Sequence, residues 1–411
     1  MTLTSKNRPL RIAFTNLTST QWTAGNHYLK NLFVALKSLD RSCCPEIILV
    51  VLHQAQLSSY SSLSDYIDQV LHLPPVPPIP QFWQRQLIRT QKYLGLWREP
   101  EPPIASCLRE HQVDCLFTNL EYGSNFSVPL LSWIPDFQHL HLPEMFSSQE
   151  IQERDELFSG VAAHADRIIL SSQDALKDFK RFAPQAVHKA RVLSFVAQVP
   201  PDIYDSNPAW VCEYYHLPDR FVYLPNQFWK HKNHNVVIQA LTLLKEKHPE
   251  ITIVCTGNTN EPRHPLYFAE LLPTISTLGL RDRLIILGLV PHTHLYQLMR
   301  QALAVLQPSI FEGWSTTVEE AKSVGKRMIL SDIPVHREQN PPHAIFFNPH
   351  EPEVLADALV RVFDEHQPGP DYELETLARE QRPRRTQEFG ATFVKLVQEV
   401  ISPSIKFNSY F

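Results

Sequence analysis

Short apolar segments alternate with helical segments along most of the chain, and this alternation is the feature that most constrains its fold. Runs such as 46–52 (EIILVVL) and 251–255 (ITIVC) are typical of strands buried on both faces of a parallel sheet. Parallel strands need long crossover connections, which are usually helices that cover the sheet. The sequence therefore predicts an α/β protein whose parallel strands are covered by helices on both faces.

The chain is long enough for two such domains. Its length of 411 residues exceeds the size of one typical hydrophobic core, and a proline-rich link at 199–208 separates two series of strands. We therefore predict a Rossmann-like N-terminal domain at 1–203, a Rossmann-like C-terminal domain at 204–385, and a C-terminal segment at 386–411 that contains an amphipathic helix from Thr386 to Ile401. The predicted strands are 10–16, 46–52, 66–73, 113–118, 130–134, 167–170, 191–196, 220–224, 251–255, 284–287, 303–307 and 327–330.

The composition is that of an ordinary globular protein, and it excludes several classes of function. The hydrophobic content is 43%, the charged content is 20% and the net charge is −5, which argues against a nucleic-acid partner. No apolar run approaches the roughly 20 residues that a membrane-spanning helix needs, and Met1–Asn7 lacks the apolar core of a signal peptide. The six cysteines are scattered without a C-x-x-C pair, so we expect reduced thiols in a cytoplasmic protein.

The most informative local pattern is a strand, a tight turn and a helix. The apolar run 303–307 predicts the strand, and 317–323 predicts a helix that ends at Gly325. Thr316 followed by Glu319 fits a capping box, which places the helix start near Thr316. Because the first N–H groups of a helix are unpaired and partly positive, this turn is suited to bind a diphosphate.

Two glutamates of this pattern can act on one ligand. Glu312 lies in the turn, and Glu320 lies one helical turn after Thr316, so these two positions share a face of the helix. A ligand at the helix start can contact Glu312 at one end and Glu320 at the other. The alternative is a pair of solvated glutamates around an ordinary turn between a strand and a helix.

This segment resembles the E-x7-E signature of retaining glycosyltransferases of the family-4 (group 1) type. The resemblance rests on Glu312-Gly313-Trp314, on the seven residues between Glu312 and Glu320, and on Gly325. It implies the GT-B fold, in which two Rossmann-like domains face each other across a cleft and a C-terminal helix crosses back to the first domain. It also implies a hexosyltransferase that moves a sugar, with retention and without a metal or other cofactor, from a nucleotide-diphosphate sugar to a hydroxyl acceptor such as a glycan or a lipid-linked sugar.

The resemblance assigns roles to residues of the second domain. It implies that Glu312 binds hydroxyls of the donor sugar, that Glu320 binds the ribose, and that Val290 with its neighbours binds the base. The backbone that holds the sugar and the phosphates comprises Gly313, Trp314, Ser315, Thr316 and Thr317. The family usually has a second Gly and a Leu-Pro where this chain has 314–317, so we expect a sugar pocket of different shape.

A nucleoside diphosphate that leaves needs fixed positive partners. Many glycosyltransferases use a divalent metal held by Asp-x-Asp, which this sequence lacks. The resemblance instead implies an Arg and a Lys from the first loop of the second domain. Lys232 stands in the place of the Lys, but the Arg is replaced by Asn226 or Gln227, depending on the alignment. Lys230 is a candidate to supply the missing charge, although an ammonium lacks the planar fork of a guanidinium.

Two loops of the first domain add candidates. The family's first loop commonly has two glycines and faces the donor phosphates and the acceptor; here only Gly25 matches, and the alternative is a plain turn. The dinucleotide pattern G-x-G-x-x-G is absent, which excludes NAD binding at this loop. Asp136 and His139 follow the strand 130–134, at the edge where parallel strands point into a ligand crevice.

The resemblance also places a polar residue of this second loop next to the reacting carbon of the donor sugar. Pro135 stands where the family usually has a His, so Asp136 and His139 are the candidates. Together with Lys232 and Glu312, they form the predicted catalytic set. Asp136, His139 and His141 have no recognised spacing for a metal, so we expect no metal site here.

Between two proline runs, residues 81–97 predict a helix with aromatic and basic faces. Such a helix in an acidic chain can lie on a membrane surface, and membrane-active members of the family dock through this part of the first domain. This interpretation places the protein peripherally at the inner face of the membrane. The alternatives are a surface helix that packs its aromatic side chains on the domain, or a flap on the acceptor side.

Two other functions stay open. A nucleotide-sugar epimerase on the same fold would need acid and base groups near C2 of the sugar, and the E-x7-E pattern argues against it. A non-catalytic GT-B subunit that binds a ligand or a partner enzyme is favoured by the loss of the Arg at Asn226.

Overall fold

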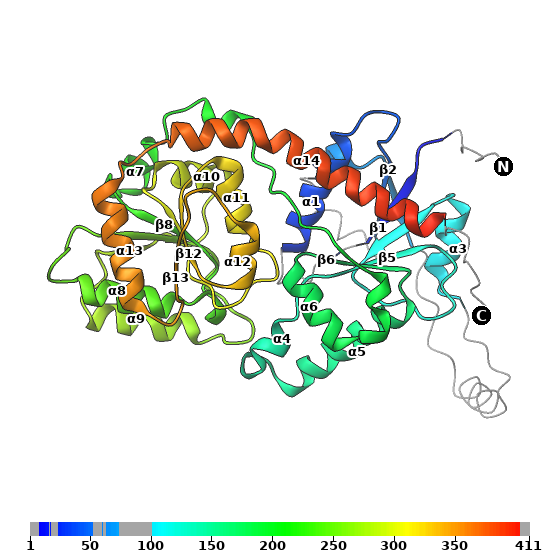
Figure 1. Ribbon diagram of the computed structural model, residues 1–411, viewed down its shortest axis with the longest axis horizontal. Coiled ribbons are helices and arrows are strands. Elements are labelled where there is room, and N and C mark those ends of the chain that lie inside the picture. Colours follow the sequence, from blue (N-terminus) through cyan, green and yellow to red (C-terminus); the bar gives the residue numbers. More distant parts are fainter. Residues whose placement is uncertain are drawn as a thin grey trace, which may run out of the picture.

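The computed structural model describes residues 8–15, 17, 24–51, 60, 63–73 and 101–402. They form two α/β domains that lie side by side, and the long helix α14 (Tyr372–Ile401) extends across both (Figure 1). The helix predicted at 81–97 lies outside the described residues. Within the described part of the chain, no helix is long and apolar enough to cross a membrane.

The first domain is built on a seven-stranded sheet in the order β3-β2-β1-β4-β5-β6-β7, and all neighbouring strands are parallel. The strands are β1 (Arg11–Phe14), β2 (Glu46–Val51), β3 (Gln69–His72), β4 (Cys115–Thr118), β5 (Leu130–Ile134), β6 (Arg167–Leu170) and β7 (Ala190–Val192). Each of the seven strands predicted for this half of the chain is present. The largest difference is at β7, which ends at Val192 instead of Val196.

Helices cover both faces of this sheet and leave an apolar core on each. α1 (Ala24–Lys37) and the end of α14 pack on one face, where Phe14 stacks against Phe393. The other core contains side chains of α3, α5 and α6. The remaining elements of this domain are α3 (Pro103–Glu110), α4 (Gln138–His141), η2 (Pro143–Met145), α5 (Ser148–His164), α6 (Gln173–Phe182) and η3 (Pro184–Lys189).

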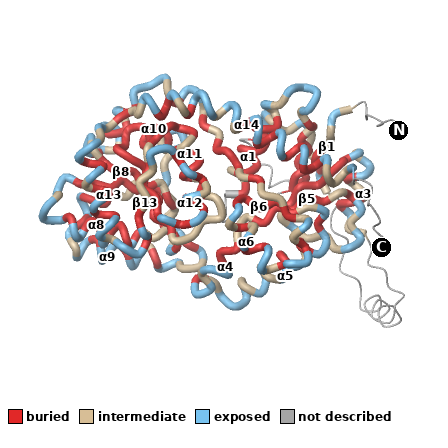
Figure 2. Tube along the Cα trace, viewed as in Figure 1, coloured by how far each residue is buried: buried red, intermediate tan, exposed pale blue. Residues whose placement is uncertain are grey.

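The second domain repeats this plan around a six-stranded parallel sheet in the order β10-β9-β8-β11-β12-β13. Its strands are β8 (Val222–Pro225), β9 (Ile253–Thr256), β10 (Leu284–Ile286), β11 (Val305–Gln307), β12 (Met328–Ser331) and β13 (Ile345–Phe347). The first five are predicted from the sequence, and β13 is not. Buried residues follow the strands of both sheets and the inner sides of the helices (Figure 2).

Helices again cover both faces of the second sheet, and the apolar side chains again form two clusters. The elements are η4 (Pro201–Tyr204), α7 (Trp210–Tyr215), η5 (Lys230–Lys232), α8 (His234–Leu244), α9 (Tyr267–Thr277), α10 (His292–Gln301), α11 (Thr316–Val324), α12 (Pro334–Gln339) and α13 (Pro352–Glu365).

The strand order reverses once in each sheet. β4 lies on the opposite side of β1 from β2, and β11 lies on the opposite side of β8 from β9. In α/β sheets, ligands bind outside the carboxyl ends of the strands at such a reversal. Each domain therefore offers one half of a site.

The helix α14 starts at Tyr372, well before the predicted start at Thr386. It continues through Pro383, which removes one backbone N–H and would normally end or kink a helix. Its first part belongs to the second domain, since Glu375 makes a buried ion pair with Arg300 at 2.7 Å. Its last part lies in the first-domain core, where Phe389 and Phe393 are buried. One helix thus joins the two domains.

Two glycines let backbones approach at this helix. Gly325 ends α11 with φ +87°, and a Cβ there would lie 2.5 Å from the Cα atom of Glu375. A Cβ on Gly390 would lie 2.5 Å from the carbonyl oxygen of Ala35 in α1. Both contacts are with backbone, which has little room to move.

We expect Gly390→Ala to destabilise the protein. Alanine normally favours a helix over glycine by about 1 kcal/mol, but here its methyl group would press on the backbone of α1, and overpacking typically costs about 1–3 kcal/mol. Thermal denaturation measures the change. Gln387→Ala, at an exposed position of the same helix, is the control and should have little effect. An equal or higher melting temperature for Gly390→Ala would contradict the close packing of α14 on α1.

Candidate functional site

A cleft of about 930 Å³ lies between the two domains. Its lining includes residues that closely follow strands of both sheets, such as Asn119 after β4, Asp136 after β5, Asn226 after β8 and Glu312 after β11. These are the carboxyl ends of the strands next to the two reversals of strand order. The cleft is therefore placed where α/β proteins bind their ligands.

The turn between β11 and α11 holds Glu312 in a fixed position. The Oε1 atom of Glu312 accepts hydrogen bonds from Lys232 Nζ at 2.6 Å and from Gln307 Nε2 at 2.9 Å. Only 9% of the Glu312 side chain and 17% of the Lys232 side chain are exposed. Glu312 and Lys232, which are predicted separately to act on the sugar and on the phosphates, thus form an ion pair with each other.

The helix α11 begins next to this pair, but its cap is Ser315 and not Thr316. The Ser315 hydroxyl accepts a hydrogen bond from the backbone N–H of Val318 at 3.5 Å. Thr316 and Thr317 form the first turn instead, and both line the cleft. The predicted capping box is therefore wrong by one residue, while the predicted positive helix end does face the cleft.

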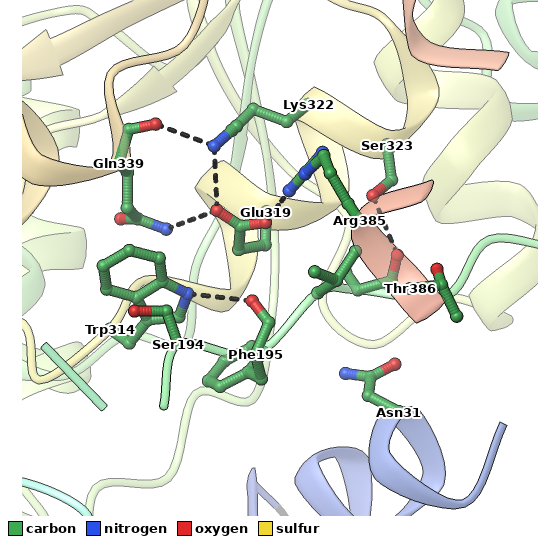
Figure 3. A network of polar contacts seen from close by, with 12 residues as sticks. Asn31, Ser194, Phe195, Trp314, Glu319, Lys322, Ser323, Gln339, Arg385 and Thr386 are labelled. Carbon is green, nitrogen blue, oxygen red and sulfur yellow. Dashed lines mark hydrogen bonds and ion pairs between the residues drawn. The ribbon is translucent and has the colours of Figure 1, made fainter. Parts of the chain in front are cut away.

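Glu319 does not reach back to the helix start. Its carboxylate is buried and accepts hydrogen bonds from Lys322 Nζ at 3.2 Å, from Gln339 Nε2 at 3.3 Å and from Arg385 of α14 (Figure 3). Gln339 also holds the turn, because its Nε2 donates to the Ser315 carbonyl at 2.9 Å. Glu319 therefore links α11 to α12 and α14.

The same turn presses against the first domain. A Cβ on Gly313 would lie 2.5 Å from the carbonyl oxygen of Pro135 and 2.8 Å from the Cβ of Asp136, so only glycine fits. The indole Nε1 of Trp314 donates to the carbonyl oxygen of Phe195 at 3.1 Å (Figure 3). Both residues line the cleft. Trp314 thus makes a direct contact between the domains.

The loop between β8 and α8 carries Asn226, one of the two candidates for the position of the family's Arg. The Asn226 side chain is buried, donates to Gln307 Oε1 and accepts from the Thr317 hydroxyl at 3.4 Å. Gly257 packs directly on its backbone, since a Cβ at that position would collide with the Asn226 carbonyl oxygen. Asn226 therefore positions the start of α11 from the neighbouring strand.

Comparison with known proteins places this geometry in a family. Residues 217–375 match the family described as glycosyl transferases group 1. This C-terminal domain is a group 1 glycosyltransferase domain. The O-antigen chain mannosyltransferase RfbU of Salmonella typhimurium is 29% identical to this chain over 134 residues, a match that covers 33% of this chain and only 36% of that protein.

Solved structures resemble the whole chain. HepE of Anabaena, in complex with UDP and glucose, has a TM-score of 0.66 at 18% identity, with 96% of this chain and 100% of that chain covered. Sucrose-phosphate synthase of Thermosynechococcus elongatus has a TM-score of 0.60 at 15% identity, with 96% and 95% covered. Together with the two parallel sheets, this similarity confirms the GT-B fold predicted from the sequence.

The end of the cleft in the group 1 domain that contains Glu320 is rich in histidine. Glu320 lies 3.4 Å from His292 Nε2, and the ring of His292 lies 5.4 Å from that of His27 in the first domain. Burial lowers the pKa of His27, which the nearby Glu320 opposes. Val290 lines the cleft next to His292. Glu320 and Val290 thus both line the cleft, and Val290 stands two residues before the His292 that lies beside Glu320.

Four of the predicted site residues do not line the cleft. His139 is buried under α5, where its Nε2 lies 3.1 Å from Asp155 Oδ1. Gly25 is buried in the first turn of α1, and Ser315 is buried as the cap of α11. Lys230 is exposed. Of the two candidates after β5, only Asp136 lines the cleft.

Several cleft residues were not predicted. His27 could have been found, because it stands two residues after Gly25. Gln307 does not line the cleft but holds Glu312 beside it, and its place at a strand end could have drawn attention to it. No such signal marks Arg154, Arg263 and Trp229. One lies within a helix and two lie in loops, and only the folded chain shows that they line the cleft.

In the part of the chain that the structure describes, no group of three His, Cys, Asp or Glu side chains is arranged to hold a metal. The six cysteines are free, as the sequence predicts.

Buried histidines brace the loop that carries Lys232. The ring of His234 stacks on Phe228 at 4.3 Å, and neither ring nitrogen has a hydrogen-bond partner among the described residues. Burial lowers the pKa of His234 to about 3 and also lowers the pKa of His231. Both rings are therefore neutral in the folded protein.

We expect stability to fall with acidification, because below the ordinary histidine pKa the unfolded chain binds protons that these two folded rings exclude. Each ring contributes up to about 1.4 kcal/mol per pH unit between its folded pKa and about 6.5. His234→Phe keeps the stacked ring and removes one titrating group, so its stability should fall less steeply when melting is followed from about pH 6.5 to about pH 4. The exposed His350→Gln is the control. Identical slopes for His234→Phe and the native protein would show that His234 is not held neutral.

Proposed function

We propose that this protein is a retaining glycosyltransferase that moves a sugar from a nucleotide-diphosphate donor to a hydroxyl acceptor without a metal. The observation that supports it best is the joint placement of the Lys232–Glu312 pair, the start of α11 and Glu320 on one cleft between two domains. A nucleotide sugar needs three binding groups in this order. The first accepts hydrogen bonds from the sugar hydroxyls, the second is positively charged and binds the diphosphate, and the third accepts hydrogen bonds from the ribose hydroxyls.

In this proposal, the leaving group is stabilised by fixed charge. As the bond between the sugar C1 and the phosphate oxygen breaks, negative charge develops on the diphosphate. Lys232 and the backbone N–H groups of Thr316 and Thr317 face that charge, and they need no rearrangement to do so. Glu312, already oriented by Gln307, accepts hydroxyl hydrogen bonds from the sugar.

Asp136 is the residue that we propose beside the reacting carbon. It lines the cleft against Gly313, and its carboxylate is held by Arg154 Nη1 at 3.1 Å and by the backbone N–H of Gln138 at 2.9 Å. The close contact between Gly313 and Pro135 narrows the cleft here, which favours transfer to the acceptor over hydrolysis by water.

The relatives support a sugar donor. RfbU is an O-antigen chain mannosyltransferase, and HepE has been solved with UDP-glucose as well as with UDP and glucose. We therefore place UDP first among the donor nucleotides to be tested, and we propose a glycan or a lipid-linked sugar as the acceptor, with the protein in the cytoplasm.

A non-catalytic subunit on the same fold is the second candidate. The observation that favours it is Asn226, whose amide is occupied by Gln307 and supplies no charge to a diphosphate. Such a subunit would bind a ligand or a partner enzyme and transfer no sugar.

Metal-free donor binding separates these functions. We expect one of UDP, GDP and ADP to bind in calorimetric titrations, with the same affinity before and after EDTA, because fixed cations replace a metal. The matching nucleotide sugar should then be consumed, and NMR should show the donor's anomeric configuration in the product. Loss of binding in EDTA would reject metal independence. Tight binding without turnover on any acceptor would favour the non-catalytic subunit.

Two substitutions test the order of the site. Lys232→Met should lower the affinity for both the nucleoside diphosphate and inorganic pyrophosphate by about tenfold or more, since a charge-assisted hydrogen bond is lost. Glu320→Ala should lower the affinity for the nucleoside diphosphate but leave the affinity for pyrophosphate unchanged, because in this proposal Glu320 binds the ribose and not the phosphates. The exposed Lys247→Met and Glu353→Ala are matched controls. If Glu320→Ala retained full nucleotide binding, the ribose assignment would be wrong.

A further inference from the structure

Two guanidinium groups from opposite domains face one aromatic ring in the cleft. The guanidinium carbon of Arg154, in α5, lies 5.0 Å from the centroid of the Phe146 ring. That of Arg263, in the loop between β9 and α9, lies 4.3 Å from the same centroid. All three residues line the cleft. The nucleotide roles proposed above use none of them.

Arg263 is short of negative partners. It donates to the amide oxygen of Gln138 at 3.2 Å and lies 5.7 Å from the Trp229 ring. Among the described residues, no carboxylate makes an ion pair with it, although Glu261, Asp136 and Glu150 are near enough to act on its charge. Burial and the nearby Arg154 lower the pKa of Arg263. A half-buried cation in this state gains most from a charged ligand.

Each acidic side chain around it already accepts at least one hydrogen bond from another residue. Glu150 accepts from the N–H and the hydroxyl of Ser147 at 2.8 Å each, which is the capping box of α5. Glu153 accepts from Gln149 at 2.8 Å, and Asp136 accepts from Arg154. Glu261 accepts from the backbone N–H of Lys230 at 2.8 Å through Oε2, while its Oε1 atom is buried and has no hydrogen-bond partner among the described residues. None of them neutralises Arg263 by direct contact.

A series of contacts connects these two guanidinium groups to the part of the cleft that we propose binds the donor sugar. Gly313 touches Asp136, Asp136 pairs with Arg154, and Arg154 shares the Phe146 ring with Arg263. An acceptor must bring its hydroxyl to the sugar C1 beside Asp136, so the rest of the acceptor extends along the cleft from there. The rings of Phe146 and Trp229 add flat apolar faces of the kind on which sugars stack.

From this arrangement, we propose that Arg263 and Arg154 bind an anionic group of the hydroxyl acceptor, a phosphate or a carboxylate, next to the donor-sugar site. The inference rests on the proposed transferase function. It assigns Arg263 to the acceptor and not to the donor diphosphate, because Arg263 contacts Gln138 and Phe146 of the first domain.

Simple sugars of different charge test this site. Glucose, glucose 6-phosphate and glucuronate are titrated into the full-length protein, alone and with saturating UDP, and binding is followed by saturation-transfer NMR and calorimetry. We expect at least one anionic sugar to bind about tenfold or more tighter than glucose, with a preference that weakens in salt. A comparison of the affinities for glucose 6-phosphate and glucuronate shows whether the site prefers a phosphate or a carboxylate.

Arg263→Gln should remove this preference, and Arg263→Lys should keep part of it, because an ammonium retains the charge but not the fork. Arg361→Gln, which breaks an exposed ion pair with Glu365, is the control for loss of a guanidinium. The affinity for UDP should be the same in Arg263→Gln as in the native protein, and equal melting temperatures would exclude misfolding.

Three results would overturn the inference. If glucose and both anionic sugars bound equally well, the protein would have no preference for a charged sugar. If the preference remained in Arg263→Gln, the anionic group would bind at a site other than Arg263. A loss of UDP affinity in Arg263→Gln as large as in Lys232→Met would assign Arg263 to the donor diphosphate. Failure of every nucleotide to bind the native protein would instead count against the transferase function, because sugar binding without UDP is measured separately.

Discussion

The candidate site depends on a buried carboxylate that does not itself line the cleft. Glu319 is held by Lys322 and Arg385, and removing one partner of a buried ion pair typically costs about 3–5 kcal/mol. Because Gln339 contacts both Glu319 and the backbone of Ser315, this carboxylate fixes the turn that presents Glu312. Arg385 belongs to α14, so the same group also ties the turn to the helix that joins the domains.

The first domain also holds this turn. Gly313 fits against Pro135, and Trp314 donates to Phe195, so the first domain contacts the turn on the side of the cleft. The Lys232–Glu312 ion pair lies between these two sets of contacts. Such preorganisation suits a reaction in which charge develops on a leaving group, since the stabilising groups need not move during the step.

Local patterns predicted most of the fold and part of the site. The apolar runs gave twelve of the strands, and the strand, turn and helix around Glu312 and Glu320 lie as expected. The cap of α11 was misplaced because Ser315 and Thr316 are both good caps, and the capping box favoured the wrong one. No local pattern could pair Glu319 with Arg385 or bring Arg154 to Arg263, since those contacts join distant parts of the chain. The interior Pro383 likewise concealed the true start of α14.

In the part of the chain that the structure describes, the chain passes between the domains at two places, the link near Val199 and the helix α14 (Figure 1). Two bodies joined at two points can rotate about the line through those points, but they cannot move apart. Opening of the cleft is therefore a rotation with its largest amplitude on the side away from α14. Pro383 lacks the N–H that would complete the helix ladder, so it marks the place where α14 can bend most easily during that rotation.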